Sequence, residues 1–158
     1  MPDTEFESEA AIRQRSQYAR GGIGTKYWDI RDATTFQWIT GDRILDVGCG
    51  EGITLEKLCS AFPGRSIEGV DVNPENVAVC RKEGLPVRQG SVYELPYADN
   101  TVDTCIFMEV IEHLDKPAHA LAELKRVLRP RGRLVIVFPY DTHMWLTRIL
   151  CLYWREAR

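Results

Sequence analysis

Short apolar runs alternate with amphipathic stretches along most of this chain. The apolar runs predict strands at residues 42–47, 65–71, 86–90, 102–107 and 132–138. The spacing of apolar positions between them predicts helices at residues 53–61, 74–83, 116–128 and 143–155. Strands and helices in this alternation predict an α/β fold, a three-layer α/β/α sandwich around a Rossmann-like, mostly parallel sheet.

The segment before the first strand has a different pattern. Residues 5–20 and 26–38 are predicted to form two helices, separated by the glycines of the segment 21–24. No strand precedes these glycines, so we expect them to stop a helix rather than to bind a phosphate. The chain therefore divides into an N-terminal helical cap, residues 1–41, and an α/β domain, residues 42–158.

The most informative segment follows the first predicted strand. An apolar run there contains Asp46 and leads into three glycines at alternate positions, Gly48, Gly50 and Gly52. A strand, a glycine turn and a helix are how a βαβ unit holds an adenosine-bearing cofactor. A dinucleotide fingerprint that begins at Gly48 would need a glycine where Ile53 stands, and Asp46 disfavours a phosphate. The segment therefore favours a cationic or zwitterionic nucleoside, with a plain strand-to-helix turn as the alternative.

A second acid supports the nucleoside interpretation. Asp71 ends the predicted strand 65–71 and lies about 20 residues after the glycine turn, the offset at which a carboxylate accepts hydrogen bonds from a ribose. The alternative is that Asp71 caps the helix that begins near Pro74, a position for which Asn73 is equally suitable.

Five segments of the chain resemble class I S-adenosylmethionine-dependent methyltransferases: ILDVGCGEG, GVDVNPENV, GSVYELPYADNTVD, CIFMEVIEHL and LKRVLRPRGRLVIVFP. They are most similar to the branch with the ubiquinone- and menaquinone-pathway enzymes and many small-molecule O-methyltransferases. The resemblance implies S-adenosylmethionine as cofactor and methyl transfer to a small-molecule or lipid-like acceptor, at oxygen. The family's fold continues into antiparallel strands, which we expect this chain to lack.

The resemblance also implies which residues hold the cofactor. Asp46 and Glu109 would set a negative potential around the sulfonium and the ammonium, and Asp71 would hold the ribose. Ser91 stands where the family usually has an acid that accepts from the adenine amino group; its hydroxyl can accept that bond, or it can be a turn serine. The other residues expected at the cofactor are Gly48, Cys49, Gly50, Gly52, Val72, Val92 and Met108.

Two histidines are candidates for the base that activates a hydroxyl acceptor, His113 and His143. Glu109, Glu112 and His113 have the spacing of one helical face and resemble the metal-binding segment of small-RNA 2′-O-methyltransferases, where Mg²⁺ would hold the acceptor. We favour the interpretation that Glu112 and His113 brace the turn without a metal. The RNA enzyme and a cofactor-binding module or fragment without catalysis remain as alternatives.

Composition and charge add exclusions. A net charge of −3 creates no field that would recruit DNA. The five scattered cysteines indicate reduced thiols and a cytoplasmic protein, the acidic N-terminus is no signal peptide, and no apolar run is long enough to span a bilayer.

Tyr18 and Trp28 are expected to be packing aromatics, with closure over the cofactor as the alternative. Residues 144–158 leave little polar face on a helix, which favours a homodimer or a truncated chain over membrane contact.

Overall fold

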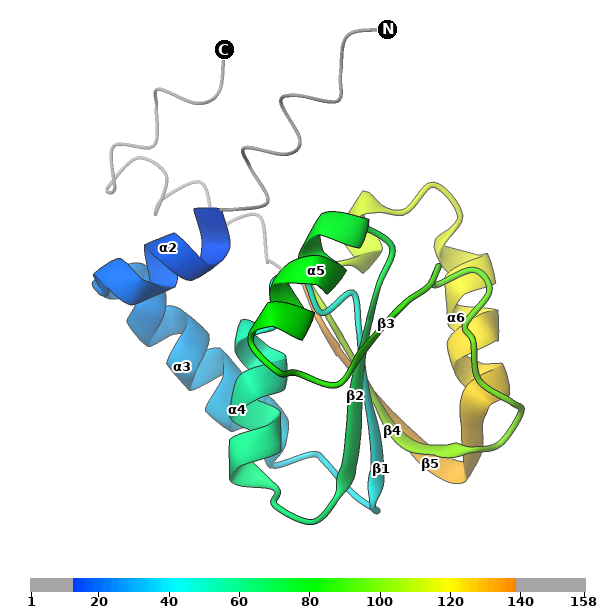
Figure 1. Ribbon diagram of the computed structural model, residues 1–158. Coiled ribbons are helices and arrows are strands. Elements are labelled where there is room, and N and C mark those ends of the chain that lie inside the picture. The colour runs from blue at the N-terminus through cyan, green and yellow to red at the C-terminus, as the bar shows by residue number, and fades with distance from the viewer. Residues whose placement is uncertain (1–12, 139–158) are drawn as a thin grey trace, which may run out of the picture.

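The computed structural model describes residues 13–138 of the chain (Figure 1). In chain order its elements are α2 (Arg13–Arg20), α3 (Ile23–Phe36), β1 (Arg43–Val47), α4 (Ile53–Ala61), β2 (Ser66–Asp71), α5 (Pro74–Lys82), β3 (Val87–Gln89), β4 (Val102–Met108), the 3-10 helix η1 (Ile111–His113), α6 (Pro117–Val127) and β5 (Leu128–Val137). The strands form one sheet in the order β3-β2-β1-β4-β5, and all four pairings are parallel. The predicted Rossmann-like fold is therefore confirmed.

Helices cover both faces of the sheet. Figure 1 shows α3, α4 and α5 on one face and α6 on the other. Side chains alternate between the faces along β1, because successive residues of a strand point in opposite directions. Ile44 belongs to the core beneath α4, and Leu45 and Val47 belong to the core beneath α6. By this alternation Asp46 shares the face of Ile44, the face that α3 and α4 cover.

Each face of the sheet has its own apolar core. The core beneath α3, α4 and α5 is built from Ile39, Ile44, Cys49, Leu55, Leu58, Ile67, Cys80, Ile106 and Met108. The core beneath α6 is built from Leu45, Val47, Val70, Leu95, Val102, Cys105, Phe107, Leu124 and Val127. Burial on both faces explains why the strands appear in the sequence as nearly continuous apolar runs.

Three predicted boundaries differ from the structure. Helix α3 begins at Ile23, so Gly24 lies inside it and the break is shorter than expected. Strand β3 keeps only three residues. Strand β5 begins at Leu128, directly after α6, and not at residue 132, because Leu128 already pairs with Val102 before the register shifts. Boundaries of this kind depend on turns and on pairing at the ends of strands, which leave no periodic pattern of apolar residues in the sequence.

Several predictions fall outside the described residues. These are the first part of the helix 5–20, the helix 143–155, His143, and the segment 144–158 with its predicted dimer contact. Within residues 13–138, no helix is both long and apolar enough to cross a membrane.

The core beneath α4 predicts a large effect of truncating Leu58, which is fully buried. Leu58→Ala should lower the free energy of unfolding by about 2–5 kcal/mol, because it removes buried methyl groups and leaves a cavity. Ile30→Ala on α3, where the side chain is 69% exposed, is the control and should change it by less than about 0.5 kcal/mol. Urea unfolding measures both. Equal effects would contradict the placement of α4 on the sheet.

Candidate functional site

Acidic residues from three strands meet at the carboxyl edge of the sheet. Asp46 lies near the end of β1, Asp71 is the last residue of β2, and Glu109 directly follows β4. The strand order reverses between β1 and β4, and ligands of open α/β sheets bind in the crevice at such a point. The fold alone therefore places the candidate site above these three carboxylates.

Two adjoining cavities open at this edge. The larger cavity has a volume of about 660 Å³ and the smaller one about 290 Å³, and Gly48, Glu109 and His113 line both. Of the residues predicted to hold the cofactor, the larger cavity also contains Asp46, Cys49, Gly50 and Met108. The smaller cavity also contains Asp71, Val72, Ser91 and Val92. All residues predicted to hold the cofactor, except Gly52, thus line one or both of these adjoining cavities.

Gly52 is the predicted site residue that lines neither cavity. It caps α4 with a left-handed backbone, φ 78°, and a Cβ there would lie 2.7 Å from the sulfur of Cys80 and 2.6 Å from Leu85. Backbone conformation and close packing require glycine here. Gly48 is also closely packed, since a Cβ there would lie 2.4 Å from Val110. Unlike Gly52, it lines both cavities.

Asp71 connects the glycine turn to α5. Its Oδ2 accepts a hydrogen bond from the Gly50 amide at 2.7 Å, and its Oδ1 accepts from the Asn73 amide at 2.9 Å and from Asn76 at 3.1 Å. Asn73 is the N-cap of α5, since its side chain accepts from the Glu75 amide. The capping role that was the alternative for Asp71 therefore belongs to Asn73.

Asp46 is a buried carboxylate without a full set of partners. Its side chain is 3% exposed, and its Oδ2 accepts no hydrogen bond within the described residues. Burial and the negative charges of Asp32 and Asp71 together raise its pKa to about 7, against the opposing effect of Arg31. A cationic ligand group in the larger cavity would supply the charge that this carboxylate lacks.

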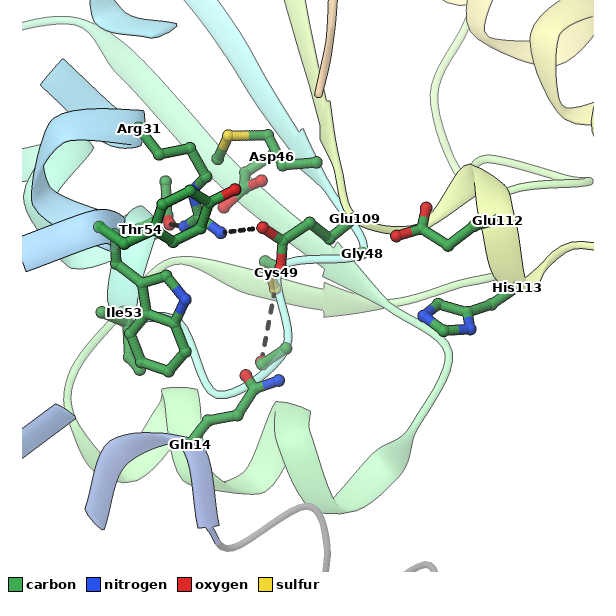
Figure 2. Close-up of a pocket in the computed structure, with 14 residues that line it drawn as sticks. Gln14, Arg31, Asp46, Gly48, Cys49, Ile53, Thr54, Glu109, Glu112 and His113 are labelled. Carbon is green, nitrogen blue, oxygen red and sulfur yellow. Dashed lines mark hydrogen bonds and ion pairs between the residues drawn. The ribbon is translucent and has the colours of Figure 1, made fainter. Parts of the chain in front are cut away.

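Arg31 is a site residue that sequence reasoning missed. From α3 its guanidinium donates to Glu109 at 3.0 Å, to Asp32 at 2.8 Å and to Thr54 at 3.1 Å, and it lines the larger cavity (Figure 2). In the sequence it is one charged residue among many on an amphipathic helix. Only the packing of α3 over the sheet brings it opposite Glu109, so no local signal could have identified it.

Asp32 ties the helical cap to the α/β domain. It is 1% exposed, and besides Arg31 it accepts from Lys57 of α4 at 2.8 Å. Lys57 also donates to Asp29 at 2.7 Å. A buried carboxylate between two cations holds both in place, because removal of one partner would leave an uncompensated buried charge.

The aromatic residues of the cap have different positions. Tyr18 and Trp28 stack with ring centroids 5.9 Å apart, and the ammonium of Lys57 lies 4.5 Å from the Tyr18 ring. Trp28 lines the larger cavity together with Tyr27, whereas Tyr18 does not. Tyr18 therefore has the packing role that was expected, and Trp28 can reach a ligand as well.

The residues of the metal hypothesis lie in different directions. Figure 2 shows Glu109 directed toward Arg31, on the side away from Glu112 and His113. Glu112 and His113 are exposed, and the described part of the chain contains no group of three His, Cys, Asp or Glu residues that could hold a metal ion. The ion pair to Arg31, which the local spacing could not reveal, accounts for the direction of Glu109.

Ser91 forms the serine turn that was one alternative, and it also lies at the smaller cavity. Its hydroxyl accepts a hydrogen bond from the Tyr93 amide at 3.2 Å, as in a serine turn, and it lines the smaller cavity. A hydroxyl oxygen has a second lone pair, so this turn bond leaves an acceptor for a ligand.

Comparisons with known proteins agree with this geometry. The family described as "Methyltransferase domain" matches residues 45–136. A protein of Mycolicibacterium smegmatis named a probable S-adenosylmethionine-dependent methyltransferase is 33% identical, over 72% of this chain and 46% of its own. The ubiquinone biosynthesis O-methyltransferase of Aeromonas salmonicida is 30% identical, over 72% of this chain and 57% of its own. A solved S-adenosylmethionine-dependent methyltransferase from Archaeoglobus fulgidus shares the fold with a TM-score of 0.67 and 23% identity, over 83% of this chain and 60% of its own.

The matched part of this chain spans about half the length of those two curated relatives. The cofactor that the family implies is S-adenosylmethionine. The residues present fit its charge, because Asp46, which lines the larger cavity, has a buried carboxylate oxygen without a partner, and Glu109 lines the same cavity.

The raised pKa of Asp46 predicts pH-dependent binding of S-adenosylhomocysteine, which carries an ammonium. Only the ionised Asp46 attracts this cation, so affinity should rise roughly tenfold from about pH 6 to about pH 8, through the pKa near 7. Isothermal titration at several pH values measures it, and Asp46→Asn should remove the dependence. An equal slope in Asp46→Asn would assign the titration to another group.

The raised pKa of Asp46 makes the stability of the unliganded protein change with pH in the direction opposite to cofactor affinity. The folded protein holds the Asp46 proton more tightly than a chain with the ordinary pKa of 3.8. The contribution of Asp46 to stability is therefore lost as the pH rises from about 4 to about 7.

Proposed function

This chain belongs to the methyltransferase-domain family, and we propose that it binds S-adenosylmethionine and transfers the methyl group to a small-molecule or lipid-like acceptor, at oxygen. The observation that carries the proposal is the buried Asp46 carboxylate, which has an unpaired oxygen, on a residue that lines a cavity at the switch point of the sheet. A buried acid without a partner is costly unless a ligand supplies the missing charge.

The two cavities divide the binding task. Asp71, Val72, Ser91 and Val92 would hold the adenosine in the smaller cavity, with the Asp71 carboxylate on the ribose hydroxyls. In the larger cavity Asp46 and Glu109 would face the cationic groups of the cofactor. Gly48, Cys49 and Gly50 would let the backbone pass beneath it, with Met108 beside them.

The acceptor would enter beside the helical cap. S-adenosylmethionine supplies a methyl group that is already activated on a sulfonium, so the protein mainly has to position the acceptor and exclude water. Trp28 and Tyr27 of α3 line the larger cavity, as does His113 of η1. His113 would take the proton of a hydroxyl acceptor, and His143, outside the described residues, is the second candidate for that role.

The ubiquinone-pathway relative supports oxygen as the acceptor atom and a lipid-like acceptor. A binding module without catalysis is the second candidate, and binding of S-adenosylhomocysteine without methyl transfer to any acceptor would favour it. The division into a cap of residues 1–41 and a domain of residues 42–158 remains part of this proposal, as do a cytoplasmic location and self-association through residues 144–158.

Loss of the Asp71 carboxylate should weaken cofactor binding. Asp71→Ala removes hydrogen bonds to a charged acceptor, worth about 1.5–3 kcal/mol, so the affinity for S-adenosylhomocysteine should fall roughly 10- to 100-fold. Asp42→Ala, an exposed acid at the opposite end of β1, is the matched control and should bind normally. Isothermal titration measures both, with circular dichroism to confirm folding. If the wild type binds neither S-adenosylmethionine nor S-adenosylhomocysteine, the proposed function fails.

Replacement of His113 should separate catalysis from binding. In a screen of hydroxyl acceptors with radiolabelled methyl donor, His113→Ala should lower the transfer rate about 10²- to 10⁴-fold, because the acceptor loses its base. The affinity for S-adenosylhomocysteine should change by less than about 0.5 kcal/mol. A chelator should leave the rate unchanged. Inhibition by the chelator, reversed by Mg²⁺, would restore the metal-assisted alternative.

A further inference from the structure

Two cysteines from distant parts of the sequence meet beneath the glycine turn. Cys49 lies in the turn between β1 and α4, and Cys80 lies on α5. The Cys80 thiol donates to the Gly50 carbonyl oxygen at 3.3 Å, and the Cys49 thiol donates to the same oxygen at 3.8 Å. The two thiols thus share one acceptor, and both side chains belong to the core beneath α3, α4 and α5, which places the sulfur atoms beside each other.

The pair can be reached through the cofactor site. Cys49 lines the larger cavity, whereas Cys80 is fully buried behind it. A molecule as small as hydrogen peroxide that enters the empty cavity therefore meets Cys49 first and has Cys80 directly behind. A bound cofactor would occupy the same cavity and shield the pair.

The surroundings shift the pKa values of the two thiols in opposite directions. The neighbouring Cys49 thiol and Arg15 lower the pKa of Cys80, whereas burial and the carboxylates of Asp71 and Asp46 oppose this. The neighbouring Cys80 thiol raises the pKa of Cys49, and burial adds to this. Cys80 is thus the sulfur that more readily carries a thiolate, the reactive form in thiol oxidation.

We propose that Cys49 and Cys80 form an oxidation site, at which hydrogen peroxide joins them in a disulfide that blocks the cofactor cavity. One thiolate attacks a peroxide oxygen, the O–O bond breaks, and the hydroxide released takes up the thiol proton to give water. The second sulfur attacks the resulting sulfenic acid, the S–O bond breaks, and the hydroxide leaves with the second thiol proton as water. Two thiols and one peroxide thus give one disulfide and two waters.

The disulfide would distort the floor of the cofactor site. It brings the sulfur atoms to about 2.05 Å, well inside their non-bonded contact distance, so the turn and α5 must move toward each other. It also removes both thiol hydrogens that the Gly50 carbonyl accepts. Gly50 is the residue whose amide holds Asp71, so the distortion reaches the acid assigned to the ribose. This blocking of cofactor binding rests on the proposed function.

The test uses the full chain, with peroxide as the oxidant. Peroxide treatment of the reduced protein should give a peptide that links Cys49 to Cys80 and a loss of two hydrogens in intact mass. The affinity for S-adenosylhomocysteine should fall at least about tenfold and return with dithiothreitol. Prior addition of S-adenosylhomocysteine should slow formation of the linked peptide.

Two variants make the outcome specific. Cys80→Ser keeps a hydroxyl that can donate to Gly50, so it should bind S-adenosylhomocysteine normally and resist peroxide. Cys59→Ser, a half-buried cysteine of α4 away from the pair, is the matched control and should stay as sensitive as the wild type. Cys80→Ala serves in place of Cys80→Ser if that variant does not fold.

Absence of the linked peptide, or equal peroxide sensitivity in Cys80→Ser, would overturn the oxidation site. A linked peptide with unchanged affinity would overturn the blocking of the cavity. Failure of the proposed function is distinguishable from both, because the reduced protein would then bind no S-adenosylhomocysteine while the linked peptide could still form.

Discussion

The candidate site depends on the ion pair between Arg31 of the cap and Glu109 at the end of β4. Asp46, Asp71 and Glu109 converge at one edge of the sheet, where their mutual repulsion is poorly screened because Asp46 and Asp71 are buried. Arg31 brings a cation into this group, 3.0 Å from Glu109. Asp32 also pairs with Arg31. The contacts of Arg31 therefore both balance the charge of the cavity and attach α3 to the domain.

The ion pair also accounts for an unusual backbone at Glu109. This residue has φ 54°, a left-handed conformation that costs a residue with a side chain roughly 1–3 kcal/mol. Its amide donates to Val137 of β5 at 2.7 Å, which fixes the turn, and its carboxylate is turned back toward Arg31. The strain is therefore held by contacts on both sides, and its result is a carboxylate that lines both cavities.

The sequence predicted most of the floor of this site, which the strand ends and the glycine turn form. It predicted little of the roof, which the cap helices α2 and α3 form. The floor follows from local rules: a two-residue period puts Asp46 on the face of Ile44, and parallel strands put their last residues, such as Asp71, at one edge. Arg31 could not be predicted, because its partner Glu109 is 78 residues away and no period connects them. Gly52 was assigned to the cofactor from its spacing, but its surroundings are Cys80 and Leu85, which only the packing of α5 reveals.

This division between floor and roof has a functional consequence. The floor that would bind the cofactor belongs to the sheet and the glycine turn, which the two cores hold rigidly. The roof consists of α2 and α3, which polar contacts attach to the domain in addition to the packing of Phe36 against the core. Arg15 of α2 donates twice to Glu51 at 2.7 Å, and Asp32 of α3 accepts from Lys57. Trp28 lines the larger cavity and takes part in neither of these contacts, so in the proposed enzyme a change at Trp28 would alter the cavity wall and leave the contact between Asp32 and Lys57 in place.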